Sequence, residues 1–110
     1  MKTAIFCLGL LGACELNGAA LAQSKETIRA GYEVAGKFCA RCHAIGLEGS
    51  SAHPSAPPFR EIAAKGNVQN LEEALGEGIV VGHPDMPQFQ FKPREVDELI
   101  AYLKSLSGKG

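Results

Sequence analysis

Small and apolar residues recur at every third or fourth position between residues 28 and 42. They are Ile28, Gly31, Ala35, Cys39 and Cys42. This spacing places them along one side of a helix, which we expect to begin at Ser24 or Thr27 and to end at Cys42. Glycine inside a helix costs roughly 1 kcal/mol relative to alanine. Gly31 and Ala35 therefore indicate that another helix crosses this side at close range.

The middle of the chain is interrupted by glycine and proline. Residues 44–58 contain two glycines, three serines and three prolines, so we expect a loop there. A short helix is predicted over residues 59–65, ended by Gly66, and another over 71–75 with Asn70 as its N-cap. Residues 81–92 include Pro84 and Pro87, which exclude a helix or a central strand.

The last predicted helix begins at Pro93, because proline suits the first turn of a helix. Acidic residues follow near its positive end, Lys104 lies near its negative end, and Gly108 lies just past its end. Its apolar face consists of Val96, Leu99, Ile100, Leu103 and Leu106. We expect this face to pack against the side that carries Gly31 and Ala35, which gives a small all-α domain.

Residues 1–22 have the features of a secretory signal peptide. A lysine at position 2 is followed by an apolar stretch too short to span a bilayer, and Ala20-Leu21-Ala22 fits a signal peptidase site. Cleavage there would leave a domain of residues 23–110, exported to the periplasm and without a transmembrane span. A second interpretation is that Leu11-Gly12-Ala13-Cys14 resembles a bacterial lipobox, in which case Cys14 would carry a lipid anchor.

The charges of the chain are nearly balanced, with a formal net charge of −1 at pH 7. Neither a basic stripe nor a polybasic patch is present, so we expect neither nucleic acid nor a charged membrane surface as a partner. The remaining 23–110 domain is small, and domains of this size often recruit a metal or cofactor to complete their core.

Residues 39–43 form a C-x-x-C-H motif, the attachment signature of a c-type haem. Cys39 and Cys42 can each add to a haem vinyl group, and His43 directly follows with an imidazole for the iron. The second ring nitrogen of a metal-bound histidine is usually held by a hydrogen bond. We expect the carbonyl of Pro57 to accept it.

Two other interpretations of the cysteine pair fit the sequence less well. A zinc site needs four ligands, but outside the leader only Cys39, Cys42 and three histidines could contribute, without a second cysteine pair. A thioredoxin-like dithiol belongs to a βαβ unit, whereas the flanking patterns are helical.

A haem iron held by one histidine has a second axial position, and Met86 is the main candidate for it. It is the only methionine outside the leader and lies between Pro84 and Pro87. His83 is a rival because imidazole also binds iron well. His53 is a weaker rival, expected at the surface in the loop after the motif. An open sixth position is a further possibility.

Taken together, these residues resemble the small monohaem class I cytochrome c family, of the exported bacterial kind with histidine and methionine ligands. The matching blocks are residues 39–43, Met86-Pro87 with Phe89, and the run Leu-Ile-Ala-Tyr-Leu-Lys at 99–104. A weaker match, residues 56–59, resembles a family segment whose proline carbonyl meets the proximal histidine.

The resemblance implies N- and C-terminal helices that cross nearly at right angles, with Gly31 and Ala35 against Leu99 and Tyr102. Short helices and loops would wrap around one haem c, bound covalently through two thioethers. The chain lacks the tryptophan that many members place near a haem propionate. The candidate propionate donors here are Arg60, Gln88 and Tyr102.

The function implied is that of a soluble one-electron carrier, monomeric and not an enzyme. It would shuttle electrons between transient protein donors and acceptors, with iron ligated by His43 and Met86. The alternatives are a haem-based gas or ligand sensor with a weak or open sixth position, and a haem subunit of a larger oxidoreductase complex. A peroxidase would need a distal acid-base residue, for which His83 and Asp85 are the local candidates.

Overall fold

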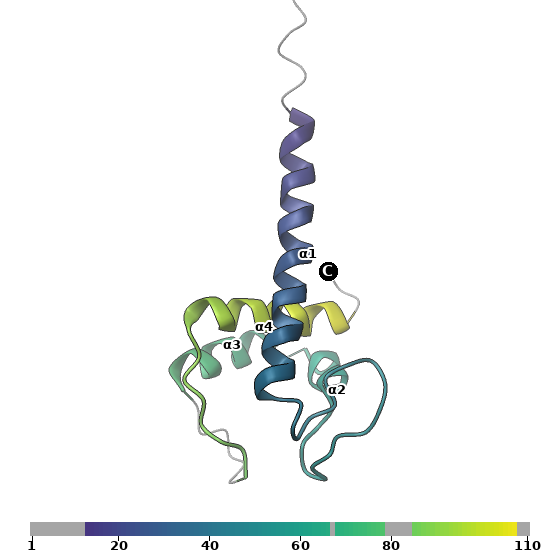
Figure 1. Ribbon diagram of the computed structural model, residues 1–110, viewed down its shortest axis with the longest axis vertical. Helices are drawn as coiled ribbons and strands as arrows, with labels where there is room; N and C mark the ends of the chain where they lie inside the picture. Colours follow the sequence, from purple (N-terminus) through teal and green to yellow (C-terminus); the bar gives the residue numbers. More distant parts are fainter. Residues whose placement is uncertain (1–12, 67, 79–84, 108–110) are drawn as a thin grey trace, which may run out of the picture.

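The computed structural model describes residues 13–66, 68–78 and 85–107 and contains four α-helices (Figure 1). They are α1 (Ala13–Phe38), α2 (Phe59–Ala64), α3 (Val68–Glu77) and α4 (Pro93–Leu106). These described residues include no strand, so the predicted all-α class is confirmed. None of the described helices combines the length and the apolar character needed to cross a membrane.

The crossing of α1 and α4 is the main packing contact of the domain, as the sequence predicted (Figure 1). A Cβ atom placed on Gly31 would overlap the carbonyl oxygen of Glu98 and would lie 2.7 Å from the Cβ of Tyr102. Ala35, one turn further along α1, is completely buried. The small residues therefore let the two helix backbones approach closely, which accounts for a glycine in the middle of a helix.

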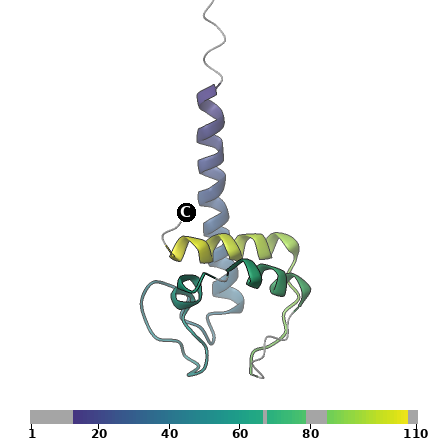
Figure 2. The same ribbon diagram turned by 180° about the vertical axis from the view of Figure 1, so that it is seen from behind.

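The core lies beneath this crossing, where α2 and α3 also pack against α4 (Figure 2). α2 lies near the C-terminal end of α4, and α3 lies along its other half. The buried cluster consists of Val34, Ala35, Phe59, Val68, Leu75, Phe91, Val96, Leu99, Ile100, Tyr102 and Leu103. All four helices thus contribute to one core, α1 through Val34 and Ala35.

The helix bounds differ from the prediction at both ends of α1. The helix already begins at Ala13 and runs through the predicted cleavage point after Ala22, since no proline interrupts this alanine-rich stretch. It ends at Phe38 instead of Cys42. The amides of Cys39 and Ala40 both donate to the Ala35 carbonyl, which ends the regular helical ladder.

The prediction for α3 was wrong at its start, whereas the prediction for α4 was correct. α3 begins at Val68, so Asn70 lies inside its first turn and not at the N-cap. The buried Val68 side chain explains the extension, because it anchors this turn in the core. α4 begins at Pro93 as expected, and the Lys92 amide donates to Glu95 Oε1 over 2.9 Å. Gly108 lies outside the described residues.

Candidate cofactor site

The motif segment (residues 39–43) forms a single turn directly after α1. The amides of Cys42 and His43 both donate to the Cys39 carbonyl, over 3.1 and 2.9 Å. Both cysteines are free thiols and partly buried. Burial raises the pKa of the Cys39 thiol to about 11 in the haem-free chain. The turn thus holds two thiols and an imidazole within five consecutive residues.

The His43 ring is oriented by the loop that follows the motif. Its Nδ1 lies 2.7 Å from the Pro57 carbonyl oxygen, so the expected hydrogen bond is present. A carbonyl can only accept, and Nδ1 must therefore carry the proton. Nε2 then has a free lone pair, the form in which a histidine binds metal. The Phe59 ring lies 5.4 Å from the His43 ring, measured between centroids, and limits its rotation.

The loop of residues 44–58 is folded back onto the motif segment by backbone hydrogen bonds. The Ala44 amide donates to Ser51 Oγ over 3.0 Å, and the Ala44 carbonyl accepts from the Phe59 amide over 2.9 Å. The His53 amide donates to the Cys42 carbonyl over 3.1 Å. These contacts place Pro57 beside His43 even though 14 residues separate the two.

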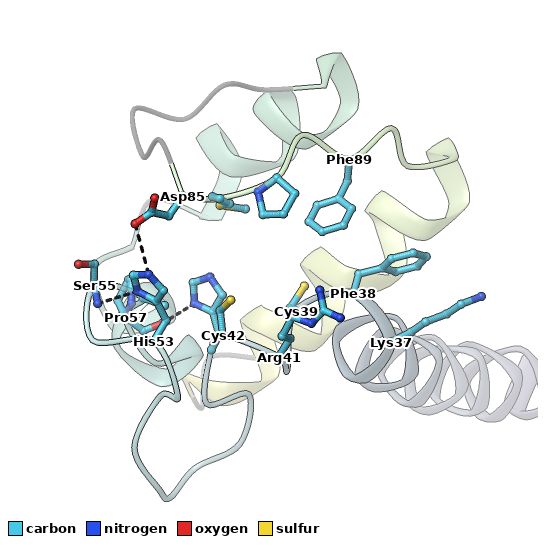
Figure 3. Close-up of a pocket in the computed structure, with 14 residues that line it drawn as sticks. Lys37, Phe38, Cys39, Arg41, Cys42, His53, Ser55, Pro57, Asp85 and Phe89 are labelled. Atoms are coloured by element: carbon cyan, nitrogen blue, oxygen red, sulfur yellow. Dashed lines mark hydrogen bonds and ion pairs between the residues drawn. The ribbon is translucent and has the colours of Figure 1, made fainter.

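A cavity of about 600 Å³ opens between the motif segment and the methionine segment (residues 85–89) (Figure 3). This volume lies within the range of cofactor and small-molecule sites. In Figure 3, Asp85 and Phe89 lie on one side of the space, and Cys39 and Cys42 lie on the other. The lining residues that come from the motif and methionine segments are Cys39, Arg41, Cys42, His43, Asp85, Met86, Pro87 and Phe89.

Met86 lines this cavity together with His43, so the two predicted ligand residues share one space. Aromatic packing holds the methionine segment on its C-terminal side. The Phe89 ring lies 5.7 Å from the Phe38 ring and 5.4 Å from the Phe91 ring, between centroids. On its N-terminal side, Asp85 Oδ2 lies 3.3 Å from His53 Nε2.

The structure changes the interpretation of the other candidate residues. His53, expected at the surface, is partly exposed with 32% of its side chain accessible, and it also lines the cavity and contacts Asp85. Its position depends on backbone contacts across a loop, and no local pattern in the sequence signals them. His83 lies outside the described residues. The zinc interpretation finds no support, because the described residues contain no cluster of three or more metal-binding His, Cys, Asp or Glu side chains.

The three candidate propionate donors are absent from the lining of the cavity. Tyr102 donates to the Ile45 carbonyl, and Gln88 donates to the Gly78 carbonyl over 3.4 Å. Arg60 lines a second cavity of about 530 Å³ near the start of α3 and the end of α4. Its Nη1 atom is buried there without a hydrogen-bond partner.

The donor set of the first cavity fits a covalently attached haem. Two thiols lie on one turn, an adjacent imidazole has a free Nε2, and a thioether lines the same space. The rest of the lining includes apolar side chains, namely Phe38, Ala56, Pro57, Pro87 and Phe89, which suit a porphyrin face.

Comparison with known proteins agrees with this assignment. The sequence model of the family described as Cytochrome c matches residues 28–107. The chain is also similar to cytochrome c-552 of Bradyrhizobium diazoefficiens, with 29% identity over 76 residues, which is 69% of this chain and 71% of the relative. No solved structure matches the chain. The range matched by the family includes all residues that line the first cavity.

Proposed function

The chain belongs to the cytochrome c family and carries covalently bound haem c, and from this premise we propose that it is an exported one-electron carrier with His43 and Met86 as iron ligands. The family assignment supports the electron-transfer role and the need for redox partners. The observation that carries the ligand assignment is that His43, with Nε2 free, and Met86 line one cavity.

In this proposal, Cys39 and Cys42 hold the cofactor through thioethers, and His43 binds the iron through Nε2. The Pro57 carbonyl accepts from Nδ1–H, which fixes the ring plane and raises the basicity of the ligand nitrogen. The bound haem supplies one-electron chemistry through its ferrous and ferric states. Because both ends of the imidazole are engaged, the ligand moves little when the charge changes.

Met86 would favour the reduced state, because a soft thioether stabilises the ferrous form and raises the reduction potential. The aromatic rings of Phe38 and Phe89 exclude water from this side of the cavity. A dry, fixed environment keeps the reorganisation that accompanies each electron small.

Partners would dock transiently, in small and wet contacts of the kind that redox complexes form. The exposed side chains of Lys37 and Arg41 border the cavity and are available to a partner surface. We further propose that residues 1–22 are removed on export to the periplasm and that the domain works as a monomer. The mass of the protein purified from whole cells, membranes included, tests the export step, because a lipid-anchored protein would begin at a modified Cys14 instead of Gln23.

An absorption spectrum of the oxidised protein tests the ligand assignment. We expect the weak long-wavelength band of an iron–sulfur bond in the wild type and its loss in Met86→Ala. Gln90→Ala is the matched control, since Gln90 is exposed and lies four residues away. A wild type that lacks the band and binds carbon monoxide readily when reduced would contradict the assignment and favour a ligand sensor. A band that survives in Met86→Ala would also contradict it.

A further inference from the structure

His53 is held at four points, although it lies in an irregular loop. Its backbone amide donates to the Cys42 carbonyl over 3.1 Å, and its carbonyl accepts from the Ala56 amide over 3.1 Å. Its Nδ1 accepts from the Ser55 amide over 3.0 Å, and its Nε2 faces Asp85 Oδ2 at 3.3 Å (Figure 3).

The contacts of the ring define its protonation. Because the Ser55 N–H donates to Nδ1, this nitrogen carries a lone pair and no proton. The proton of the neutral ring is therefore on Nε2, which lies 3.3 Å from the Asp85 carboxylate. The contact is a close polar contact between a partly exposed imidazole and an exposed carboxylate, which faces the ring edge that carries Nε2.

Together these contacts connect the two segments that carry the proposed iron ligands. Through its amide, His53 is joined to Cys42, the neighbour of His43. Through its ring, it is joined to Asp85, the neighbour of Met86. We infer that His53 is a positioning residue that ties the methionine segment to the motif segment and so holds Met86 in its place as sixth ligand; this inference rests on the proposed function.

The aromatic contact of Phe89 with Phe38 holds the other end of the methionine segment. Met86 thus lies between a polar attachment and an aromatic one, each reaching a different wall of the cavity. Loss of the polar attachment would free the N-terminal side of the segment while the core under α1 and α4 remains intact. The expected effect is a more easily displaced Met86, with little change in global stability.

Imidazole binding to the oxidised haem-loaded protein measures this effect, because imidazole must displace Met86 from the iron. Since an exposed polar contact of this kind is modest, we expect His53→Ala and Asp85→Ala each to lower the imidazole dissociation constant by roughly twofold to fivefold. The double variant should lower it no further than either single variant, because both remove the same contact.

Two further variants separate positioning from other effects. His53→Gln keeps a donor near the position of Nε2 and should restore binding close to the wild-type value. Asp97→Ala removes an exposed carboxylate from α4, away from the cavity, and should leave binding unchanged. The midpoint of denaturant unfolding should stay close to that of the wild type in all of them.

The outcomes distinguish this inference from the proposed function. If the wild type shows the iron–sulfur band but both single variants bind imidazole as the wild type does, the positioning role of His53 is overturned. Met86 ligation then still stands. Additive effects in the double variant, or no rescue by His53→Gln, would also overturn the positioning role. A wild type without the band would overturn Met86 ligation, and the positioning role would fall with it.

Discussion

The close approach of α1 and α4 at Gly31 can be tested with one substitution made at two positions of the same helix. Replacing glycine by alanine inside a helix stabilises it by about 0.5–1 kcal/mol, because the chain loses less entropy on folding. Gly36 is exposed, and a Cβ there would meet no atom within 4 Å. Gly36→Ala should therefore raise the free energy of unfolding by that amount.

Gly31→Ala should have the opposite sign. The added methyl group would overlap the Glu98 carbonyl, and this obstacle is backbone that no side-chain rotation can remove. Forcing atoms into a packed contact typically costs about 1–3 kcal/mol, which exceeds the gain in helix propensity. We expect a net loss of about 1–2 kcal/mol in the free energy of unfolding.

Urea unfolding of the haem-loaded protein, followed by far-ultraviolet circular dichroism, measures both variants on one scale. For a domain of this size, a change of 1 kcal/mol shifts the melting temperature by about 4–8 °C, so thermal unfolding provides a second readout. Equal stabilisation by Gly31→Ala and Gly36→Ala would refute the close crossing. A loss in both variants would refute the argument from helix propensity.

Two further predictions concern the core around α4. Tyr102 donates a hydrogen bond to the Ile45 carbonyl, and burial, with a smaller effect of Tyr32, raises the pKa of its phenol above the ordinary value of 10. As pH rises above 10, the unfolded chain therefore loses this proton before the folded one does, and the free energy of unfolding should fall. The fall should be smaller in Tyr102→Phe, and parallel pH profiles of the two proteins in urea unfolding would contradict this. Leu103 is 1% exposed, so Leu103→Ala should cost about 2–5 kcal/mol. Leu47 is 65% exposed, so Leu47→Ala should change stability by less than about 0.5 kcal/mol, and similar unfolding midpoints for the two variants would contradict the core assignment.

The parts of the fold that follow from local chemistry were predictable from the sequence. Pro93 fixes the start of α4 because its backbone angle suits a first turn, and Glu95 completes that turn. Gly31 and Ala35 indicated the crossing because small residues on an amphipathic stripe leave room for a second helix backbone. The need of a ligand histidine for a second hydrogen bond predicted an acceptor for His43, and the family resemblance of residues 56–59 indicated the Pro57 carbonyl.

The parts that depend on contacts between distant segments were not predictable in this way. The start of α3 at Val68 depends on a core that forms only when α4 is in place. His53 belongs to a loop without periodicity, and its role depends on Cys42 and Asp85, which lie on either side of the cavity.

The α1–α4 contact joins positions near opposite ends of the domain, so it cannot form until nearly the whole domain has been synthesised. During synthesis at roughly 5–20 residues per second, several seconds separate the appearance of Gly31 from that of Tyr102. In that interval the nascent polypeptide cannot form its principal interhelical contact. Cys39 and Cys42 would emerge early in the interval, long before the residues of the last helix that closes the domain.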